Sequence, residues 1–170
     1  TCTISNDDQS PSLTLVKQVI NNNGGSALPS AWTLTAAGPT GFSGAGPSVS
    51  NGAGFQTGTY TLSESTGPAG YAASAWVCTG GSQNGNQITL TLGQSATCTI
   101  TNDDAGPGLT LVKQVINDNG GTALASAWTL TAAARTGFSG PGPSVSNGAN
   151  FQAGAYNLSE SGGPANYSAS

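Results

Sequence analysis

The sequence predicts an all-β protein made of tandem β-sandwich domains, and three observations support this prediction. Apolar and polar residues alternate over short runs, such as residues 13–20 and 59–65, which is the pattern of half-buried strands. Turn signals rich in glycine and asparagine separate the runs, and no segment repeats apolar residues at helical spacing. The chain also repeats itself, because the run Leu-Thr-Leu-Val-Lys at 13–17 returns letter for letter at 109–113. Seven or so short strands in each repeat are typical of a β-sandwich.

The repeat sets the expected domain boundaries. Residues 1–8 match residues 97–104, so we expect them to be the last strand of a preceding repeat. Residues 11–104 form one complete sandwich, and residues 107–170 form a second repeat that is incomplete at its C-terminus. The chain is therefore expected to be an excerpt of a longer array, and the alternative is a natural subunit.

Four strands are expected in the first half of the complete repeat. Residues 13–20 form the first strand, and the run Asn-Asn-Asn-Gly-Gly at 21–25 ends it. Residues 31–36 alternate and form the second. Two short strands are expected near residues 47–50 and 54–57.

Four more strands complete the repeat. Residues 59–65 alternate cleanly, and residues 71–79 form a long strand after them. The turn signal Asn84-Gly85 precedes a strand at 87–92, and residues 97–102 form the last strand.

Composition excludes several classes of function. Charged residues make up 6% of the chain, Lys and Arg together number 3, and the net charge is -4, so no basic surface for nucleic acid can form. There is no His, which argues against a metal site of the His or Cys-cluster kind, and we expect no cofactor. No apolar run reaches the length of a membrane span, so we expect no membrane insertion in this segment.

The three cysteines follow the repeat. Cys2 and Cys98 occupy the same position in successive repeats, and the counterpart of Cys78 would lie past residue 170. One interpretation is a Cys78–Cys98 disulfide within the complete repeat, with the partner of Cys2 outside this chain segment. The other interpretation is free thiols in a cytosolic protein.

Three polar residues share strand faces with apolar ones. Lys17 alternates with Leu13 and Leu15, Glu64 lies on an apolar face of the strand at 59–65, and Asn102 lies on one of the last strand. A buried lysine loses its proton easily, and the neutral amine can attack the side-chain carbonyl of an asparagine. A neighbouring glutamic acid can polarise that carbonyl and shuttle protons to the leaving ammonia. The product would be a Lys–Asn isopeptide bond, and the alternative is a buried ion pair with the asparagine hydrogen-bonded nearby.

Three motifs now suggest a family. Leu-Thr-Leu-Val-Lys at 13–17, Gly-Thr-Tyr-Thr-Leu-Ser-Glu at 58–64 and Thr-Ile-Thr-Asn at 99–102 resemble the Cna-B-like domains of Gram-positive surface adhesins and pilins. These domains are also called SpaA-like or prealbumin-fold domains, and they have an Ig-like sandwich. The resemblance implies that Lys17 and Asn102 form the isopeptide bond and that Glu64 is the catalytic proton shuttle. The cysteines are an addition to the best-known members of the family.

The incomplete units carry matching residues. Lys113 and Glu160 correspond to Lys17 and Glu64, and Asn6 corresponds to Asn102. In an array, the missing partners lie elsewhere on the same polypeptide. In a natural subunit, residues 1–8 of one copy could complete the open sandwich of another, so that Lys113 faces Asn6 of a neighbour and a filament grows.

We therefore expect an extracellular structural repeat of a bacterial surface stalk, fibre or pilus-like filament. It is not an enzyme, apart from single-turnover isopeptide formation. Its expected partners are neighbouring repeats or copies of the same protein, and a host surface ligand. The alternative is an adhesive binding module that grips a host protein or glycan through glycine-rich loops such as residues 38–46.

Overall fold

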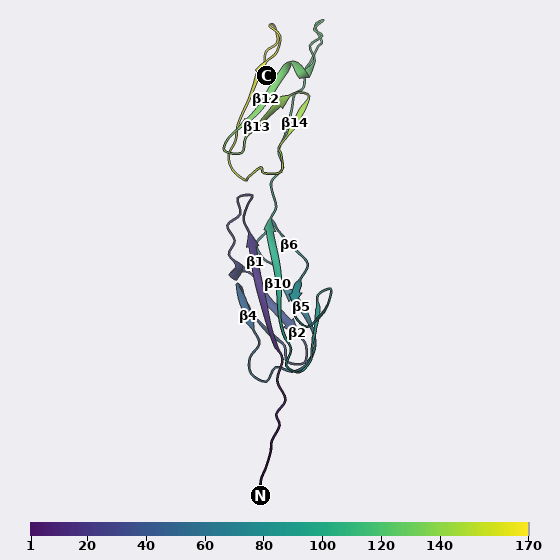
Figure 1. Ribbon diagram of the computed structural model, residues 1–170. Helices are drawn as coiled ribbons and strands as arrows, with labels where there is room; N and C mark the ends of the chain where they lie inside the picture. The colour runs from purple at the N-terminus through teal and green to yellow at the C-terminus, as the bar shows by residue number, and fades with distance from the viewer. Residues whose placement is uncertain (170) are drawn as a thin grey trace. The chain divides into compact units, whose positions relative to one another are not determined.

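The computed structural model describes residues 1–169 and divides the chain into two compact units (Figure 1). Unit 1 comprises residues 1–21 and 26–105, and unit 2 comprises residues 22–25 and 106–170. The first ten residues are exposed and have no regular structure. Two short 3-10 helices, Pro29–Ala31 and Ala125–Ala127, are the helical segments of residues 1–169, so the predicted all-β class is confirmed.

Unit 1 is a sandwich of two sheets, and the first sheet is built on its two longest strands. Strands β1 (Ser12–Ile20) and β10 (Ser95–Asp104) pair in parallel along their whole length and run side by side in Figure 1. The other strands of this sheet are β4 (Ser48–Ser50), β6 (Tyr71–Ala73) and β7 (Val77–Thr79). β4 borders β1, whereas β6 and β7 both pair with β10.

The second sheet of unit 1 is antiparallel and has the order β3-β2-β5-β9-β8. Its strands are β2 (Thr33–Ala37), β3 (Phe42–Ala45), β5 (Gly58–Glu64), β8 (Ser82–Asn84) and β9 (Gln87–Leu90). Alternate residues of both sheets point into one apolar core, as the period of two requires. The core contains Leu13, Leu15, Leu34, Ala36, Phe55, Tyr60, Leu62, Trp76, Ile88, Leu90, Ala96, Cys98 and Ile100.

Unit 2 repeats part of this plan. Strand β11 (Thr110–Val112) pairs with β14 (Ser144–Ser146), and β12 (Trp128–Ala133) pairs with β13 (Phe138–Pro141) and β15 (Asn157–Gly162). Within residues 1–169, unit 2 has no strand on the edge of β11 that would correspond to β10 on β1.

Four sequence-based expectations about strands were wrong. Residues 54–57 do not form a strand, since the chain turns at residues 53–54, where Gly54 has a φ of +74°, and the apolar alternation is absent. The long strand expected at 71–79 is two strands, because residues 74–76 leave the ladder between β6 and β7. Ala31 belongs to a 3-10 helix, and β2 begins two residues later.

The fourth error concerns the expected glycine-rich loop at residues 38–46. It contains strand β3, which pairs with β2 and places Phe42 against Phe55 with ring centroids 5.7 Å apart. Gly44 of this strand faces Val49, and a Cβ at Gly44 would lie 2.7 Å from a methyl carbon of that valine. The segment is therefore a packed part of the sheet and not an open loop.

Candidate functional site

The site begins with a lysine in the core. Along β1, the alternating residues Leu13, Leu15 and Lys17 are buried, and Lys17 is only 2% exposed. The side chain of Lys17 alone has no exposed surface. The backbone alternation that buries the two leucines therefore carries an amine into the interior.

Two other strands bring polar groups to this amine. β10 lies beside β1 in a register that pairs Lys17 with Ile100 and Val19 with Asn102, so Asn102 is one step along the same face. Glu64 is the last residue of β5 and approaches from the facing sheet. The three residues come from three strands of two sheets.

Their side chains meet. Lys17 Nζ lies 2.5 Å from Glu64 Oε2 and also donates a hydrogen bond to Asn102 Oδ1. Asn102 is 3% exposed, and the Glu64 side chain is 12% exposed. The amine thus contacts a carboxylate and an amide carbonyl at once, in the buried interior of unit 1.

The pKa of Lys17 reflects two opposing influences. Burial disfavours the ammonium form and lowers the pKa below its ordinary value of 10.5, and the hydrogen bond and charge of Glu64 oppose that change. Desolvation is the larger effect, so the pKa is lowered. The fold therefore favours the neutral, nucleophilic form of this amine more than water does.

Trp32 and Gly46 complete the walls of the site, and sequence reasoning did not connect either of them with it. Lys17 Nζ lies 4.6 Å from the centroid of the Trp32 ring. Gly46 is buried, and a Cβ there would lie 2.9 Å from the Lys17 Cβ and 2.5 Å from the Pro29 carbonyl oxygen. The repeat held the missing signal, because a tryptophan and a glycine recur at the same spacing from Lys113 in unit 2.

A disulfide lies on the same strand as Asn102. Cys78 of β7 and Cys98 of β10 are directly opposite in the antiparallel register, and they are joined. The predicted Cys78–Cys98 bond is therefore confirmed, and it ties β10 to the neighbouring strand. Cys2 is an exposed free thiol in this structure.

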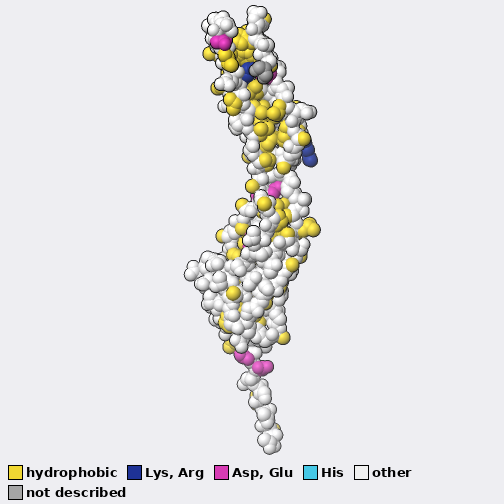
Figure 2. All heavy atoms as spheres, turned by 180° about the vertical axis from the view of Figure 1, so that it is seen from behind, with side chains coloured by type: hydrophobic (Ala, Val, Ile, Leu, Met, Phe, Trp, Pro, Cys, Tyr) yellow, Lys and Arg dark blue, Asp and Glu magenta, His cyan; other side chains and the backbone are white. Residues whose placement is uncertain are grey.

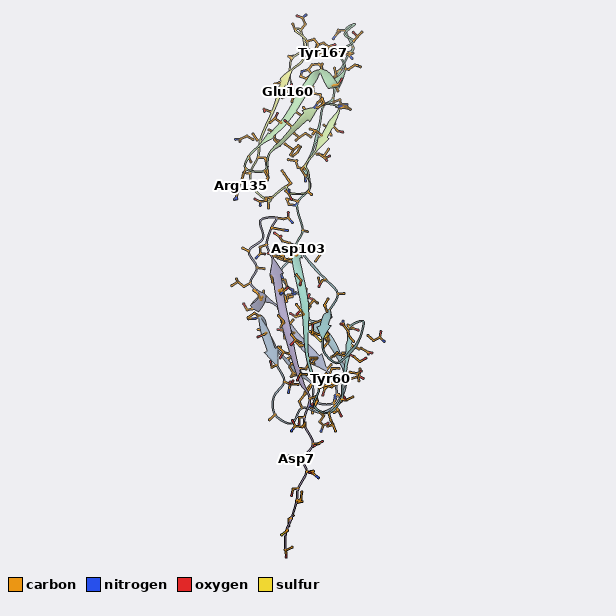
Figure 3. All side chains as sticks on the ribbon, viewed as in Figure 1. Asp7, Tyr60, Asp103, Arg135, Glu160 and Tyr167 are labelled. Carbon is orange, nitrogen blue, oxygen red and sulfur yellow. A yellow bond between two sulfur atoms is a disulfide. The ribbon has the colours of Figure 1, made fainter. Side chains whose placement is uncertain are left out.

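Unit 2 holds two of the three residues. Lys113 Nζ lies 2.6 Å from Glu160 Oε2 and 4.8 Å from the centroid of the Trp128 ring. These side chains are more exposed than in unit 1, at 16% for Lys113 and 29% for Glu160. They line an open groove of about 440 Å³ together with Tyr167, which lies at the same end of unit 2 as Glu160 (Figure 3). Asn6 lies in the exposed first segment of the chain.

The part of the chain that the structure describes contains neither a candidate metal site nor a candidate membrane-spanning helix. No group of three or more His, Cys, Asp or Glu side chains gathers closely enough to hold a metal ion there. None of the helices in residues 1–169 has the length and apolar character that a membrane span needs.

Comparison with known proteins gives one result. A family model described as a prealbumin-like fold domain, of the SpaA type, matches residues 8–100 and again residues 104–170. No curated protein and no solved structure matched the chain. The two matched segments cover almost the whole sequence, and the chain belongs to the family of SpaA-type prealbumin-like fold domains.

Proposed function

We propose that unit 1 forms an intramolecular isopeptide bond between Lys17 and Asn102, and that Glu64 moves the protons. The observation that carries this proposal is the position of one buried amine, which contacts both the Glu64 carboxylate and the Asn102 amide. Because the fold holds the three groups together, the reaction is unimolecular, and its geometry is supplied before the chemistry begins.

The reaction starts with proton transfer. The Lys17 ammonium gives a proton to Glu64, and the neutral amine attacks Cγ of Asn102 to give a tetrahedral intermediate. Glu64 then passes its proton to Nδ2 and takes a second proton from Nζ. The Nζ–Cγ bond has formed, the Cγ–Nδ2 bond breaks, and ammonia leaves with the remaining proton as ammonium.

Burial of the amine favours an isopeptide bond between Lys17 and Asn102 over a simple ion pair between Lys17 and Glu64. A lysine without water around it carries a desolvation cost that an ion pair offsets only in part. Conversion to an amide removes the charge and so removes that cost. The contact with Asn102 also places an electrophilic carbonyl carbon beside the amine. An ion pair between Lys17 and Glu64 would not require an electrophile at this position.

At the level of the whole protein, a SpaA-type prealbumin domain suggests a structural module of a pilus or another surface assembly. We propose an extracellular stalk, fibre or pilus-like filament at a bacterial cell surface, with residues 11–104 and 107–170 as successive repeats. The disulfide supports an oxidising compartment for this chain. Neighbouring repeats would be the main partners.

Intact mass of the reduced chain tests the proposed bond. The wild-type chain should weigh one ammonia less than its sequence, and peptide mapping should join the segment that contains Lys17 to the one that contains Asn102. Glu64→Gln keeps the shape but removes the proton acceptor, so it should restore the full mass. The neighbouring Ser63→Ala is the matched control, since Ser63 is exposed, and it should keep the lower mass. A wild-type chain of full mass would overturn the proposal.

A further inference from the structure

We propose that Tyr71 is a positioning residue for the isopeptide reaction, and that it acts by holding the Trp32 ring against the Lys17 amine. The inference rests on the function proposed above, because it concerns the same site. It adds a residue that takes no part in the proton transfers and sets only where the nucleophile lies.

Trp32 is the wall that limits where the amine can move. The tryptophan is 2% exposed, and its ring centroid lies 4.6 Å from Lys17 Nζ. On its other sides the amine meets Glu64 and Asn102. On the face that Figure 2 shows, the described residues of unit 1 display no lysine or arginine side chain, in keeping with the burial of Lys17. A wall that keeps Nζ beside the Asn102 carbonyl favours the geometry of attack.

Two residues hold the Trp32 ring in this place. The Tyr71 ring meets it edge-on, with centroids 5.4 Å apart and an interplanar angle of 75°. Gly67 lies against the indole nitrogen, since a Cβ at residue 67 would come within 2.0 Å of Trp32 Nε1. An edge-to-face pair of aromatic rings stabilises a particular arrangement of the two rings. A Tyr71 ring that is itself fixed therefore fixes the tryptophan.

The hydroxyl of Tyr71 fixes its ring to the segment that follows β1. It donates a hydrogen bond to Asn21 Oδ1 and accepts one of 2.9 Å from the backbone N–H of Ala27. Asn21 Nδ2 donates in turn to the Ala27 carbonyl oxygen over 3.1 Å. Asn21 directly follows β1, the strand that carries Lys17. The tyrosine therefore joins the end of the lysine strand to the tryptophan ring.

The backbone of Tyr71 lies beside the strand of the electrophile. β6 pairs with β10 so that Tyr71 is opposite Asp104 and Ala73 is opposite Asn102. One short strand thus borders the asparagine and also carries the ring that restrains the wall of the lysine. A change of the Tyr71 side chain leaves these backbone pairs available, so its ring and hydroxyl can be tested apart from the strand.

Unit 2 contains the same assembly. Tyr167 meets Trp128 edge-on with ring centroids 5.4 Å apart and an interplanar angle of 77°. Its hydroxyl donates to Asn117 Oδ1 over 2.6 Å and accepts from the Ala123 N–H over 3.2 Å. The Trp128 centroid lies 4.8 Å from Lys113 Nζ. The two units therefore build the same contacts around the same lysine, which favours a role at the lysine.

The test follows the loss of ammonia in time. The full chain is recovered unfolded in urea, its full starting mass is checked, and dilution into a glutathione redox buffer starts folding. Circular dichroism and the intact mass of reduced samples then give separate rates for folding and for bond formation. Tyr71→Phe keeps the ring and removes the hydroxyl, so it should fold and then lose ammonia about fivefold more slowly than the wild type. Asn21→Ala removes the acceptor of the same hydroxyl and should also slow bond formation.

Tyr60→Phe is the matched control. The Tyr60 hydroxyl also makes two hydrogen bonds, a donated one of 2.7 Å to the Gln56 carbonyl and one of 2.8 Å with Thr40 Oγ1. Tyr60 is buried in the core, and Figure 3 shows it toward the opposite end of unit 1 from Asp103, the neighbour of Asn102. Once it has folded, Tyr60→Phe should lose ammonia at the wild-type rate.

A double-variant cycle tests the route through the tryptophan. Trp32→Phe puts a smaller ring in the wall and should itself slow the loss of ammonia. If Tyr71 acts through Trp32, the chain with both Tyr71→Phe and Trp32→Phe should be as slow as Trp32→Phe alone. Rate losses that multiply in the double variant would mean that Tyr71 acts by another route, and they would overturn the inference.

The outcomes separate this inference from the proposed function. A folded wild-type chain that keeps its full mass overturns the isopeptide bond and this inference together. A wild-type chain that loses ammonia, with Tyr71→Phe as fast as Tyr60→Phe, overturns this inference alone. A slower Tyr71→Phe chain, whose difference disappears in the Trp32→Phe background, establishes Tyr71 as a positioning residue.

Discussion

The proposed chemistry of this protein depends on one side chain, Lys17, which is buried in a largely apolar interior. The lysine is held there by a strand whose other inward residues are leucines, and its amine meets Glu64 and Asn102. Lys113 has the same carboxylate partner in unit 2 but remains partly exposed beside an open groove. The difference between the two lysines is therefore the strand that covers them.

The lowered pKa of Lys17 gives a prediction about pH. In an Asn102→Ala variant the amine stays free, and its folded pKa lies below its unfolded value near 10.5. Between those two values the unfolded chain binds more protons than the folded one, so the free energy of unfolding should rise with pH across that window. Urea unfolding at a series of alkaline pH values measures the slope.

A second variant isolates the lysine in that experiment. Lys17→Met in the Asn102→Ala background removes this amine and leaves every other titrating group in place. It should show a smaller slope than Asn102→Ala alone. Equal slopes in the two variants would mean that Lys17 titrates alike in the folded and unfolded chain.

At the scale of the elements, β10 pairs with three strands of its sheet. It pairs in parallel with β1, it pairs with β6 and β7 on its other side, and it carries both Cys98 and Asn102. Its inward residues alternate strictly, from Ala96 to Asp104. Among residues 1–169, no equivalent strand lies on β11 in unit 2, and Leu111, the inward residue of β11, is only partly buried.

The disulfide should contribute most when it is the sole crosslink. We expect Cys78→Ala with Cys98→Ala, made in the Asn102→Ala background, to lower the free energy of unfolding by about 3 kcal/mol. The two cysteines are 20 residues apart in the sequence, and the disulfide closes this loop in the unfolded chain. Removing the disulfide therefore raises the conformational entropy of the unfolded chain. Cys2→Ala in the same background is the control and should change the unfolding midpoint little. If the unfolding curves of the Asn102→Ala chain with and without the two cysteine changes coincide, the disulfide contributes nothing to the free energy of unfolding.

Strands could be predicted from the sequence where one buried face requires apolar residues at every second position. Strands without such a face were missed. β1, β5 and β10 were predicted because apolar residues recur at every second position in each strand, as in the pairs Leu13 and Leu15, Tyr60 and Leu62, and Cys98 and Ile100. β8 was missed because all three of its residues are exposed, so no face is apolar. β3 was missed because it has one large apolar residue, Phe42.

The same reasoning explains what was foreseen of the site. The inward positions of Lys17 and Asn102 follow from period two, which is local information. The approach of Trp32 to the amine depends on how the two sheets pack, and no single strand encodes it. Likewise, the close passage of Gly46 beside Lys17 is visible only when both strands are in place.

At the scale of the whole molecule, the small number of basic residues gives a further prediction. Lys and Arg together number 3, and they are Lys17, Lys113 and Arg135. Trypsin should cut the folded chain at exposed Arg135 and spare buried Lys17. After denaturation and reduction, trypsin should still spare Lys17 in the wild type, because an acylated lysine is no longer a cation.

Asn102→Ala supplies the comparison for that digest. Its denatured chain should be cut at all three basic residues, whereas the wild-type chain should yield a single fragment of residues 1–113, lighter by one ammonia, in which Lys17 is joined to Asn102. Cleavage after Lys17 in the denatured wild type would contradict the bond. The readout is the peptide mass, so it does not depend on the stability of either chain.

The parallel pairing of β1 with β10 has a consequence for tension. The polypeptide enters unit 1 at the start of one strand and leaves it at the far end of its neighbour, so a pull on the two ends slides the strands past each other. The hydrogen bonds between β1 and β10 then resist the pulling force together, in shear, and do not break one after another. With Lys17 bonded to Asn102, the load would pass directly from one strand to the other, and the intervening polypeptide would carry none of it.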